Sequence, residues 1–304
     1  MCRLFGLTAG HTRVRATFWL LDAPDSLTTQ SRANPDGTGL GTFDERGRPV
    51  VEKQALAAYD DADFTGEARD RTSATFLAHV RHSSGAAVRL ENTHPFEMEG
   101  RLFAHNGVVE GMDVLESHLG DDLGRVRGET DSERLFALVT RETAAAHGDV
   151  GQGLTAALRW VAAELPVYAV NVVLTTPHRL WAVRYPATHA LWVLERHETR
   201  GRLDHRSSAG TRVVSHDLSD AASVVVASER LDDDDRWRLV EPGVLLAVDE
   251  RLEVTERLVV DSEPRHSLNL DDLGAAAASQ SPTGGAAPTG GAAPTGGAAP
   301  TGGV

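Results

Sequence analysis

The chain has 304 residues, of which 44 are acidic and 30 basic, so its formal net charge is -14. This balance argues against a nucleic-acid partner, because such a protein needs a basic surface that displaces counterions from phosphates. No apolar run approaches the ~18 residues that cross a bilayer, no leader-like segment begins the chain, and a single cysteine cannot form an internal disulfide; we therefore expect a cytoplasmic protein.

The first candidate site is Cys2, the single cysteine, which directly follows Met1 and precedes an apolar strand expected over residues 3–9. A small second residue normally permits removal of the initiator methionine, which would give Cys2 a free α-amine beside its thiol. An α-amine with an ordinary pKa of about 7.7–8.0 can take the proton from the thiol and so activate a nucleophile. A hydrophobic strand that happens to carry a buried cysteine is the alternative that position alone leaves open.

The next segments alternate between helix and strand signals. Residues 14–33 begin as a helix and break near Pro24 into a polar stretch. The segment 34–41, NPDGTGLG, predicts a turn followed by a strand that another backbone approaches closely, because glycine leaves room for it. A phosphate-binding loop is the weaker alternative, since no Gly-Lys-Ser/Thr follows. Residues 50–56 can pair back as a hairpin strand, and residues 60–70 favour a helix.

The middle of the chain predicts two strands and then three helices. Residues 75–81 alternate with a strand period, and residues 101–105 form a second strand that we expect to end in a tight turn at Asn106-Gly107. Helices are expected over residues 111–119, 130–147 and 151–164, the second with Thr130 or Asp131 near its N-cap.

The second half is rich in strands. These are expected over residues 167–175, 178–185, 190–194, 223–228, 244–248 and 252–260. Strands on both sides of a helical middle predict an α+β fold of two sheets with helices outside. The run Asp232–Asp235 is interpreted as a solvated loop rather than a metal site. The PTGGAA repeats from Pro282 onward carry no aromatic or charged side chain, so residues 275–304 are expected to be a disordered tail.

Together these pieces resemble the class II glutamine amidotransferases, which are N-terminal-nucleophile hydrolases. The matching segments occur in that family's order and approximate spacing, and they are MCRLFGL, NPDGTGLG, HVRHSSG, NTHPF, AHNG and ETDSE. The later segment VVVASERLDDDDRW looks like the C-terminal signature of the small stand-alone members. The resemblance implies a four-layer αββα sandwich. We expect residues 1–274 to form this domain.

The resemblance also implies roles for residues at matching positions. Cys2 would be the nucleophile and its freed α-amine the base, while Asn106 and the Gly107 N–H would form the oxyanion hole. Removing one such preorganised donor typically costs on the order of 2.7–4 kcal/mol. The reaction would be attack on a γ-amide, loss of ammonia or an amine, and hydrolysis of the γ-glutamyl thioester.

The substrate-binding residues follow from the same comparison. Arg81 would hold the α-carboxylate of the donor and Asp131 its α-ammonium, while the backbone of Thr93 and His94 would line the pocket. A glutamine-like donor carries both charges, so this pair of clamps would separate it from simpler amides. The segment from Asn34 to Gly37 would support the pocket from the next strand.

No cofactor or metal is expected. His79, His82, His94 and His105 suggest a zinc site, but the three-residue spacing of His79 and His82 on a strand directs their side chains to opposite faces. The partner is expected to be glutamine or a γ-glutamyl small molecule, with a separate ammonia-accepting synthetase subunit as a further option, because we find no acceptor-domain sequence after the first domain.

Alternatives concern the substrate and the class of function. One small family member acts on a γ-glutamyl sulfoxide intermediate of ergothioneine biosynthesis, but such members usually begin Met-Cys-Arg-His and this chain has Leu4. An acylase or peptidase on the same scaffold would need neither charge clamp. A non-enzymatic interaction module would have no use for Cys2, Asn106 and Gly107 together.

Overall fold

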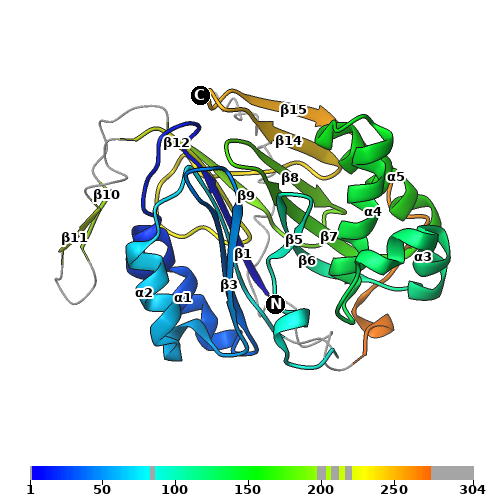
Figure 1. The fold of residues 1–304 in the computed structure, drawn as a ribbon, viewed down its shortest axis with the longest axis horizontal. Helices are drawn as coiled ribbons and strands as arrows, with labels where there is room; N and C mark the ends of the chain where they lie inside the picture. Colours follow the sequence, from blue (N-terminus) through cyan, green and yellow to red (C-terminus); the bar gives the residue numbers. More distant parts are fainter. Residues whose placement is uncertain (1, 83–85, 197–202, 207–211, 216–220, 275–304) are drawn as a thin grey trace, which may run out of the picture.

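The computed structural model describes residues 2–82, 86–196, 203–206, 212–215 and 221–274. Two sheets lie face to face in the middle of the molecule, with α1 and α2 outside one sheet and α3, α4 and α5 outside the other (Figure 1). The expected α+β class and the four-layer αββα arrangement are thereby confirmed. The expected disorder of residues 275–304 lies outside the described residues.

The first sheet has the N-terminal strand near its centre, and all its pairings are antiparallel. Its strands in spatial order are β13 (Arg238–Leu239), β9 (Trp192–Arg196), β12 (Ser223–Ala227), β1 (Arg3–Thr8), β4 (Thr75–Val80), β2 (Thr38–Phe43) and β3 (Pro49–Gln54). Because β1 lies between β12 and β4, the residue that precedes it is held among segments that are far apart in sequence.

The second sheet is built from the middle and the end of the chain. Its strands in order are β15 (Val254–Leu258), β14 (Val244–Val248), β8 (Leu180–Tyr185), β7 (Pro166–Thr175), β6 (Arg101–Val109) and β5 (Phe96–Met98), with β16 (His266–Ser267) parallel to β7. A separate hairpin joins β10 (Leu203–Arg206) to β11 (Arg212–Ser215). The strand prediction for the second half therefore holds, with ends shifted by a few residues.

The two longest described helices, α4 and α5, begin where the sequence supplies a capping side chain. Thr130 accepts a hydrogen bond from the Glu133 N–H at the start of α4, and Asp149 accepts one from the Gln152 N–H at the start of α5. The α-helices are α1 (Leu27–Gln30), α2 (Ala62–Asp70), α3 (Met112–Leu119), α4 (Asp131–Ala145) and α5 (Val150–Glu164). Shorter helical turns are η1 (Phe18–Asp22), η2 (Ser31–Ala33), η3 (Ala58–Asp60), η4 (Leu90–Asn92), η5 (Gly120–Arg125) and η6 (Leu270–Asp272).

The expectation of one helix at the start of residues 14–33 is only partly right. This segment forms the π-helical turn η1, then α1 and η2, with an extended break at Ala23 just before Pro24. Proline disfavours the helical conformation of the residue before it, which accounts for the break. Phe18, Trp19 and Leu20 are buried against the first sheet.

Apolar cores between and outside the sheets hold the layers together. Between the sheets, Leu4 and Leu77 from the first sheet pack with Leu102 and Val173 from the second. The outer core over the second sheet includes Phe103 of β6, stacked on Phe136 of α4 at 4.8 Å between ring centroids. Burial of each such side chain contributes about 1.5–3 kcal/mol.

The glycine-spaced strand β2 is approached by another backbone, as the sequence predicts. A Cβ on Gly39 would lie 2.0 Å from the carbonyl oxygen of His94, and one on Gly41 would lie 2.9 Å from Cγ of Pro95. The segment around residues 92–96 can therefore cross directly over β2. This crossing brings the NTHPF motif next to the NPDG turn.

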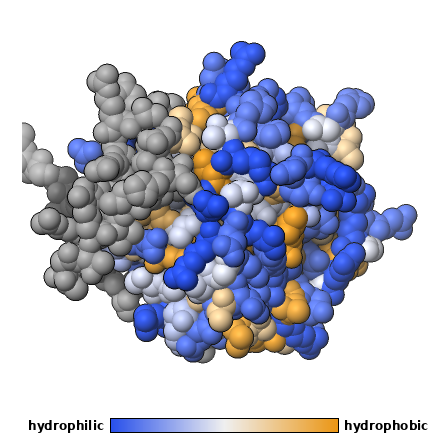
Figure 2. Space-filling view, turned by 60° about the vertical axis from the view of Figure 1, so that its left-hand side comes forward, coloured by the Kyte–Doolittle hydropathy of each residue, from blue (hydrophilic) through white to orange (hydrophobic). Residues whose placement is uncertain are grey.

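The surface agrees with the acidic composition. Figure 2 shows a mostly hydrophilic face on which hydrophobic residues form small separate patches. Within the described part of the chain, every helix is too short or too polar to traverse a lipid bilayer.

Candidate active site

Cys2 directly precedes β1 and lies beside the end of the neighbouring strand β4. Arg3 pairs with Val80 across these strands, so the chain just before β1 meets the chain just after β4. The Cys2 sulfur accepts a hydrogen bond from the His82 N–H at 3.2 Å. Burial raises the pKa of the Cys2 thiol, while the His82 N–H and the charge of Arg81 lower it in part. A thiol in this position needs a base to become a nucleophile.

A pocket of about 190 Å³ opens beside Cys2. It collects residues from the end of β4, from the NTHPF segment, from β6 and from the start of α4. Its lining consists of Cys2, Arg81, His82, Ala86, Asn92, His94, His105, Gly107, Val108, Val109, Glu129, Thr130, Asp131 and Ser132. Five of the seven predicted site residues are in this set; Asn106 and Thr93 are not.

Arg81 is buried at one wall of the pocket and is held by backbone groups. Its N–H donates to the carbonyl oxygen of Gly37 at 2.8 Å, and its carbonyl oxygen accepts from the Asp36 N–H at 3.0 Å. Its guanidinium donates to the carbonyl oxygens of Ala86 at 2.9 Å and Ala87 at 3.2 Å. The NPDG turn thus supports Arg81 through its last two residues.

Asp131 lines the same pocket and joins the start of α4 to the second sheet. It is the first residue of α4, and Thr130, not Asp131, is the N-cap. One carboxylate oxygen of Asp131 accepts a 3.0 Å hydrogen bond from the Val109 N–H, and the other accepts one of 2.8 Å from the Ser132 N–H. The carboxylate is therefore fixed in orientation at the pocket wall.

The prediction of a tight turn at Asn106-Gly107 is wrong. Strand β6 continues through both residues to Val109, with Asn106 opposite Asn171 and Gly107 opposite Val170 on β7, and an irregularity follows at Val108/Val109. Glycine is needed here for another reason: a Cβ on Gly107 would lie 1.9 Å from the carbonyl oxygen of Ala169. Asn106 donates its side-chain amide to the Cys2 carbonyl oxygen at 3.0 Å.

Thr93 and His94 differ in their relation to the pocket. Thr93 is buried, its hydroxyl donates to the Arg89 carbonyl oxygen at 2.8 Å, and its own carbonyl oxygen accepts from the Lys53 ammonium at 2.8 Å. His94 lines the pocket, and its ring lies 4.2 Å from that of His79. Burial holds the pKa of His94 well below its usual range, so this imidazole is neutral.

One polar chain was not assigned from the sequence. Nδ1 of His105 lies 2.9 Å from the Ser132 hydroxyl, which lies 3.2 Å from a carboxylate oxygen of Asp131. His105 and Ser132 stand directly beside Asn106 and Asp131 in the AHNG and ETDSE segments, which is the signal that could have found them. The chain ties β6 to α4 behind the pocket.

The described residues contain no group of three or more His, Cys, Asp or Glu side chains that could hold a metal ion. In the acidic run, Asp232 accepts a 2.7 Å hydrogen bond from the Trp237 indole, and Asp234 pairs with Arg236 at 2.6 Å. These two carboxylates therefore fix the loop after β12.

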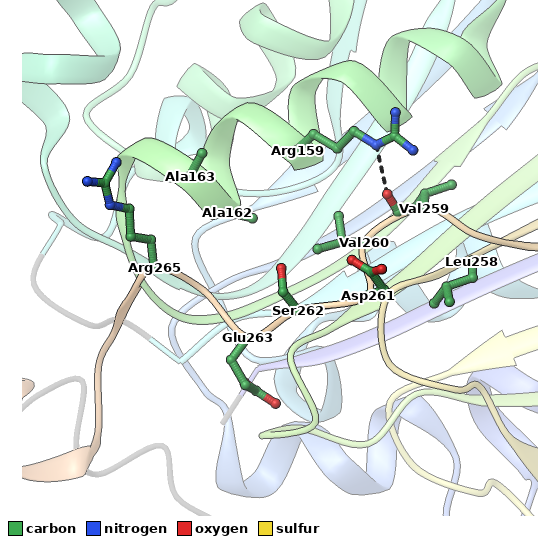
Figure 3. A pocket seen from close by; sticks show the side chains of 10 residues that line it. All are labelled: Arg159, Ala162, Ala163, Leu258, Val259, Val260, Asp261, Ser262, Glu263 and Arg265. Atoms are coloured by element: carbon green, nitrogen blue, oxygen red, sulfur yellow. Dashed lines mark hydrogen bonds between the residues drawn. The ribbon is translucent and has the colours of Figure 1, made fainter.

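A larger pocket, of about 530 Å³, lies between α5 and the segment after β15 (Figure 3). Arg159 of α5 spans one side and donates to the Val259 carbonyl oxygen at 2.8 Å, while Asp261 and Ser262 lie below it. The described residues that line this pocket carry both charges, from Arg159, Arg265, Asp261 and Glu263, but they include no thiol. Its size alone does not make it a better catalytic candidate than the pocket at Cys2.

Two facing, mainly antiparallel sheets with helices on both outer sides are the arrangement of the N-terminal-nucleophile hydrolase fold. The glutamine phosphoribosylpyrophosphate amidotransferase of B. subtilis shares this fold with a TM-score of 0.60 at 18% identity, over 86% of this chain and 50% of that one. A class-II glutamine aminotransferase domain protein of Silicibacter pomeroyi has a TM-score of 0.56 at 21% identity, over 84% of this chain and 98% of that one.

The family follows from sequence. A model of the class-II glutamine amidotransferases matches residues 1–269, and the chain belongs to this family. YafJ of Escherichia coli is 28% identical over 184 residues, which are 56% of this chain and 68% of YafJ. The gamma-glutamyl-hercynylcysteine sulfoxide hydrolase of Mycobacterium tuberculosis is 33% identical over 120 residues, which are 36% of this chain and 50% of that protein.

Proposed function

We propose that this protein hydrolyses γ-glutamyl amides with the Cys2 thiolate as nucleophile. The observation that carries the proposal is the convergence of a thiol, a guanidinium and a carboxylate, from Cys2, Arg81 and Asp131, on one pocket of about 190 Å³. A donor with an α-carboxylate and an α-ammonium would find an opposite charge for each group. The comparison with class-II amidotransferases supports the same chemistry.

The proposed reaction begins once Met1 has been removed. The α-amine of Cys2 takes the thiol proton, and the thiolate adds to the γ-carbonyl carbon. The resulting oxyanion would be stabilised by the Gly107 N–H and by the Asn106 amide, which has a second N–H besides the one on the Cys2 carbonyl. The carbon–nitrogen bond then breaks, the leaving amine takes the proton, and water hydrolyses the γ-glutamyl thioester.

A narrower substrate is the second candidate. The Mycobacterium tuberculosis relative is named for hydrolysis of a γ-glutamyl sulfoxide compound, which supports a specific γ-glutamyl intermediate as substrate. At the position where such proteins usually carry histidine, Leu4 is buried in the core between the sheets. Leu4 is not part of the pocket lining, so this difference does not by itself select between the two substrates. A separate subunit that accepts ammonia remains a further proposal.

The test is intact-mass spectrometry before and after a glutamine-mimicking electrophile, diazo-oxo-norleucine, combined with assays of glutamine and a panel of γ-glutamyl amines. We expect loss of Met1, one covalent label on the sole thiol, and release of ammonia or amine. Cys2→Ala should abolish both labelling and turnover while circular dichroism and melting temperature stay unchanged. Turnover at the wild-type rate in Cys2→Ala would overturn the proposal.

A further inference from the structure

A polar row crosses the inner face of the second sheet next to Cys2. Asn106 on β6 is directly opposite Asn171 on β7, which is directly opposite Arg184 on β8. Residues opposite one another in adjacent strands point to the same face. Two positions along, the row of Ala104, Val173 and Ala182 is apolar and belongs to the core between the sheets. The polar row therefore ends that core on the side where Asn106 holds the Cys2 carbonyl.

Asn106, Asn171 and Arg184 each donate to a backbone carbonyl, but the side-chain oxygens of the two asparagines accept nothing from the described residues. The Asn171 amide donates to the carbonyl oxygens of Ala190 at 2.9 Å and His189 at 3.4 Å, and Arg184 Nε donates to the His189 carbonyl at 2.7 Å. The side-chain oxygens of Asn106 and Asn171 are buried and have no partner among the residues described. These two residues are only 1% and 0% exposed. A buried carbonyl oxygen without a hydrogen-bond donor costs free energy of folding, so two such oxygens side by side indicate a binding site for a group that carries N–H or O–H donors.

We propose that Asn171 is a positioning residue that acts, together with Asn106, on the α-amine of Cys2. The inference rests on the proposed function, in which Met1 is removed and that amine is the base. The freed amine brings new N–H donors to the polar row, and the two asparagine oxygens accept them directly or through one water. A neutral amine has two N–H groups and one lone pair. Holding both N–H groups directs the lone pair toward the Cys2 sulfur, which then gives up its proton to the nitrogen.

The test substitutes the acceptor, Asn171, and measures how the pH dependence of kcat/KM reports the pKa of the α-amine. Asn171→Ala removes a group that stabilises the ammonium form, so the acid limb of kcat/KM should move to lower pH, with kcat about tenfold lower because the base is less well oriented. Asn171→Asp places a carboxylate near the ammonium, so the same limb should move to higher pH by about one pH unit. KM should change less than twofold in both. Asn171→Ser keeps a smaller acceptor and replaces Asn171→Ala if that variant does not fold.

Alkylation by iodoacetamide as a function of pH provides a readout that needs no substrate, because Cys2 is the sole cysteine. The pH at which alkylation begins to rise should move to lower pH in Asn171→Ala and to higher pH in Asn171→Asp. Arg184→Lys is the matched control: Arg184 shares the contact with the His189 carbonyl but lies one strand farther from Asn106, so both limbs should stay in place.

The outcomes are distinct. Limbs that do not move in either Asn171 variant, or that move equally in Arg184→Lys, would show that Asn171 only holds the segment at residues 189–190. Retention of Met1 in the active protein would also overturn the inference. If no γ-glutamyl compound is hydrolysed, the proposed function fails, yet opposite shifts of the alkylation limb would still support the placement of the amine.

Discussion

The side-chain amide of Asn106 donates a 3.0 Å hydrogen bond to the carbonyl oxygen of Cys2, across 104 positions of sequence. Cys2 precedes the central strand of one sheet, and Asn106 belongs to β6 of the other. The candidate nucleophile is thereby held by both sheets at once. Its position depends on the packing of the whole sandwich and not on one loop.

Asn106→Ala should lower kcat for γ-glutamyl hydrolysis by about 10²–10³-fold, as expected when one oxyanion donor is lost. KM should change little, because the donor acts on charge that develops in the transition state. Steady-state kinetics with glutamine give both values. Asn269→Ala, at the exposed N-cap of η6, is the control and should leave kcat unchanged. An equal effect on kcat in both variants would remove Asn106 from the site.

Gly107→Ala should destabilise the fold as well as abolish activity. The new Cβ would lie 1.9 Å from the Ala169 carbonyl oxygen and 2.7 Å from Nε2 of His105, so β6 and β7 would have to separate. Such overpacking typically costs about 1–3 kcal/mol. Urea unfolding measures it. Gly66→Ala in α2 meets nothing within 4 Å and should stabilise by up to about 1 kcal/mol; comparable stability of the two variants would contradict the prediction.

The sequence predicted the repeating parts of this fold well. Alternation located β4, and a capping residue located the start of α4, because these signals are local. The glycine spacing of β2 also had its expected cause, a close backbone approach. The order of the motifs gave the family and, with it, the layers.

Signals that depend on tertiary neighbours were misread or missed. Asn106-Gly107 has the composition of a tight turn, but pairing with β7 extends the strand through it. The link from His105 through Ser132 to Asp131 joins the AHNG and ETDSE motifs. His105 and Ser132 are 27 positions apart, and neither motif alone indicates that they are in contact. The hydrogen bonds from the Arg81 guanidinium to two backbone carbonyl oxygens could not be predicted either, because a sequence specifies no partner for a backbone group.

Asp131→Asn should act selectively on substrates that carry an α-ammonium. Hydrogen bonds to charged groups contribute about 1.5–3 kcal/mol, so kcat/KM for glutamine should fall roughly 10–150-fold. For N-acetylglutamine, kcat/KM should change less than about threefold, because this substrate has no ammonium that the Asp131 carboxylate could bind. Measuring both substrates in both enzymes separates this role from a structural one. Asp113→Asn, in the first turn of α3 and outside the pocket, is the matched control. Equal losses on both substrates would assign Asp131 only to the wall it forms with Val109.

The pH dependence of stability should come in part from His79. This side chain is fully buried, and burial lowers its pKa to about 3. In the unfolded chain its pKa is about 6.5, so between pH 6.5 and pH 3 the unfolded state binds a proton that the folded state does not. The contribution to the free energy of unfolding is complete above pH 6.5 and falls by about 1.4 kcal/mol per pH unit below it.

His79→Leu should therefore flatten the acid side of the stability profile. Leucine has a similar volume and Leu4 lies directly opposite on β1, so apolar packing at this position is kept at neutral pH. Between pH 7.5 and pH 5.0 the wild type should lose about 2 kcal/mol more than the variant, in urea unfolding at each pH. His266→Leu, at an exposed position in β16, should leave the wild-type dependence unchanged. If His79→Leu and the wild type lose the same free energy over this interval, the buried imidazole is not the group that titrates.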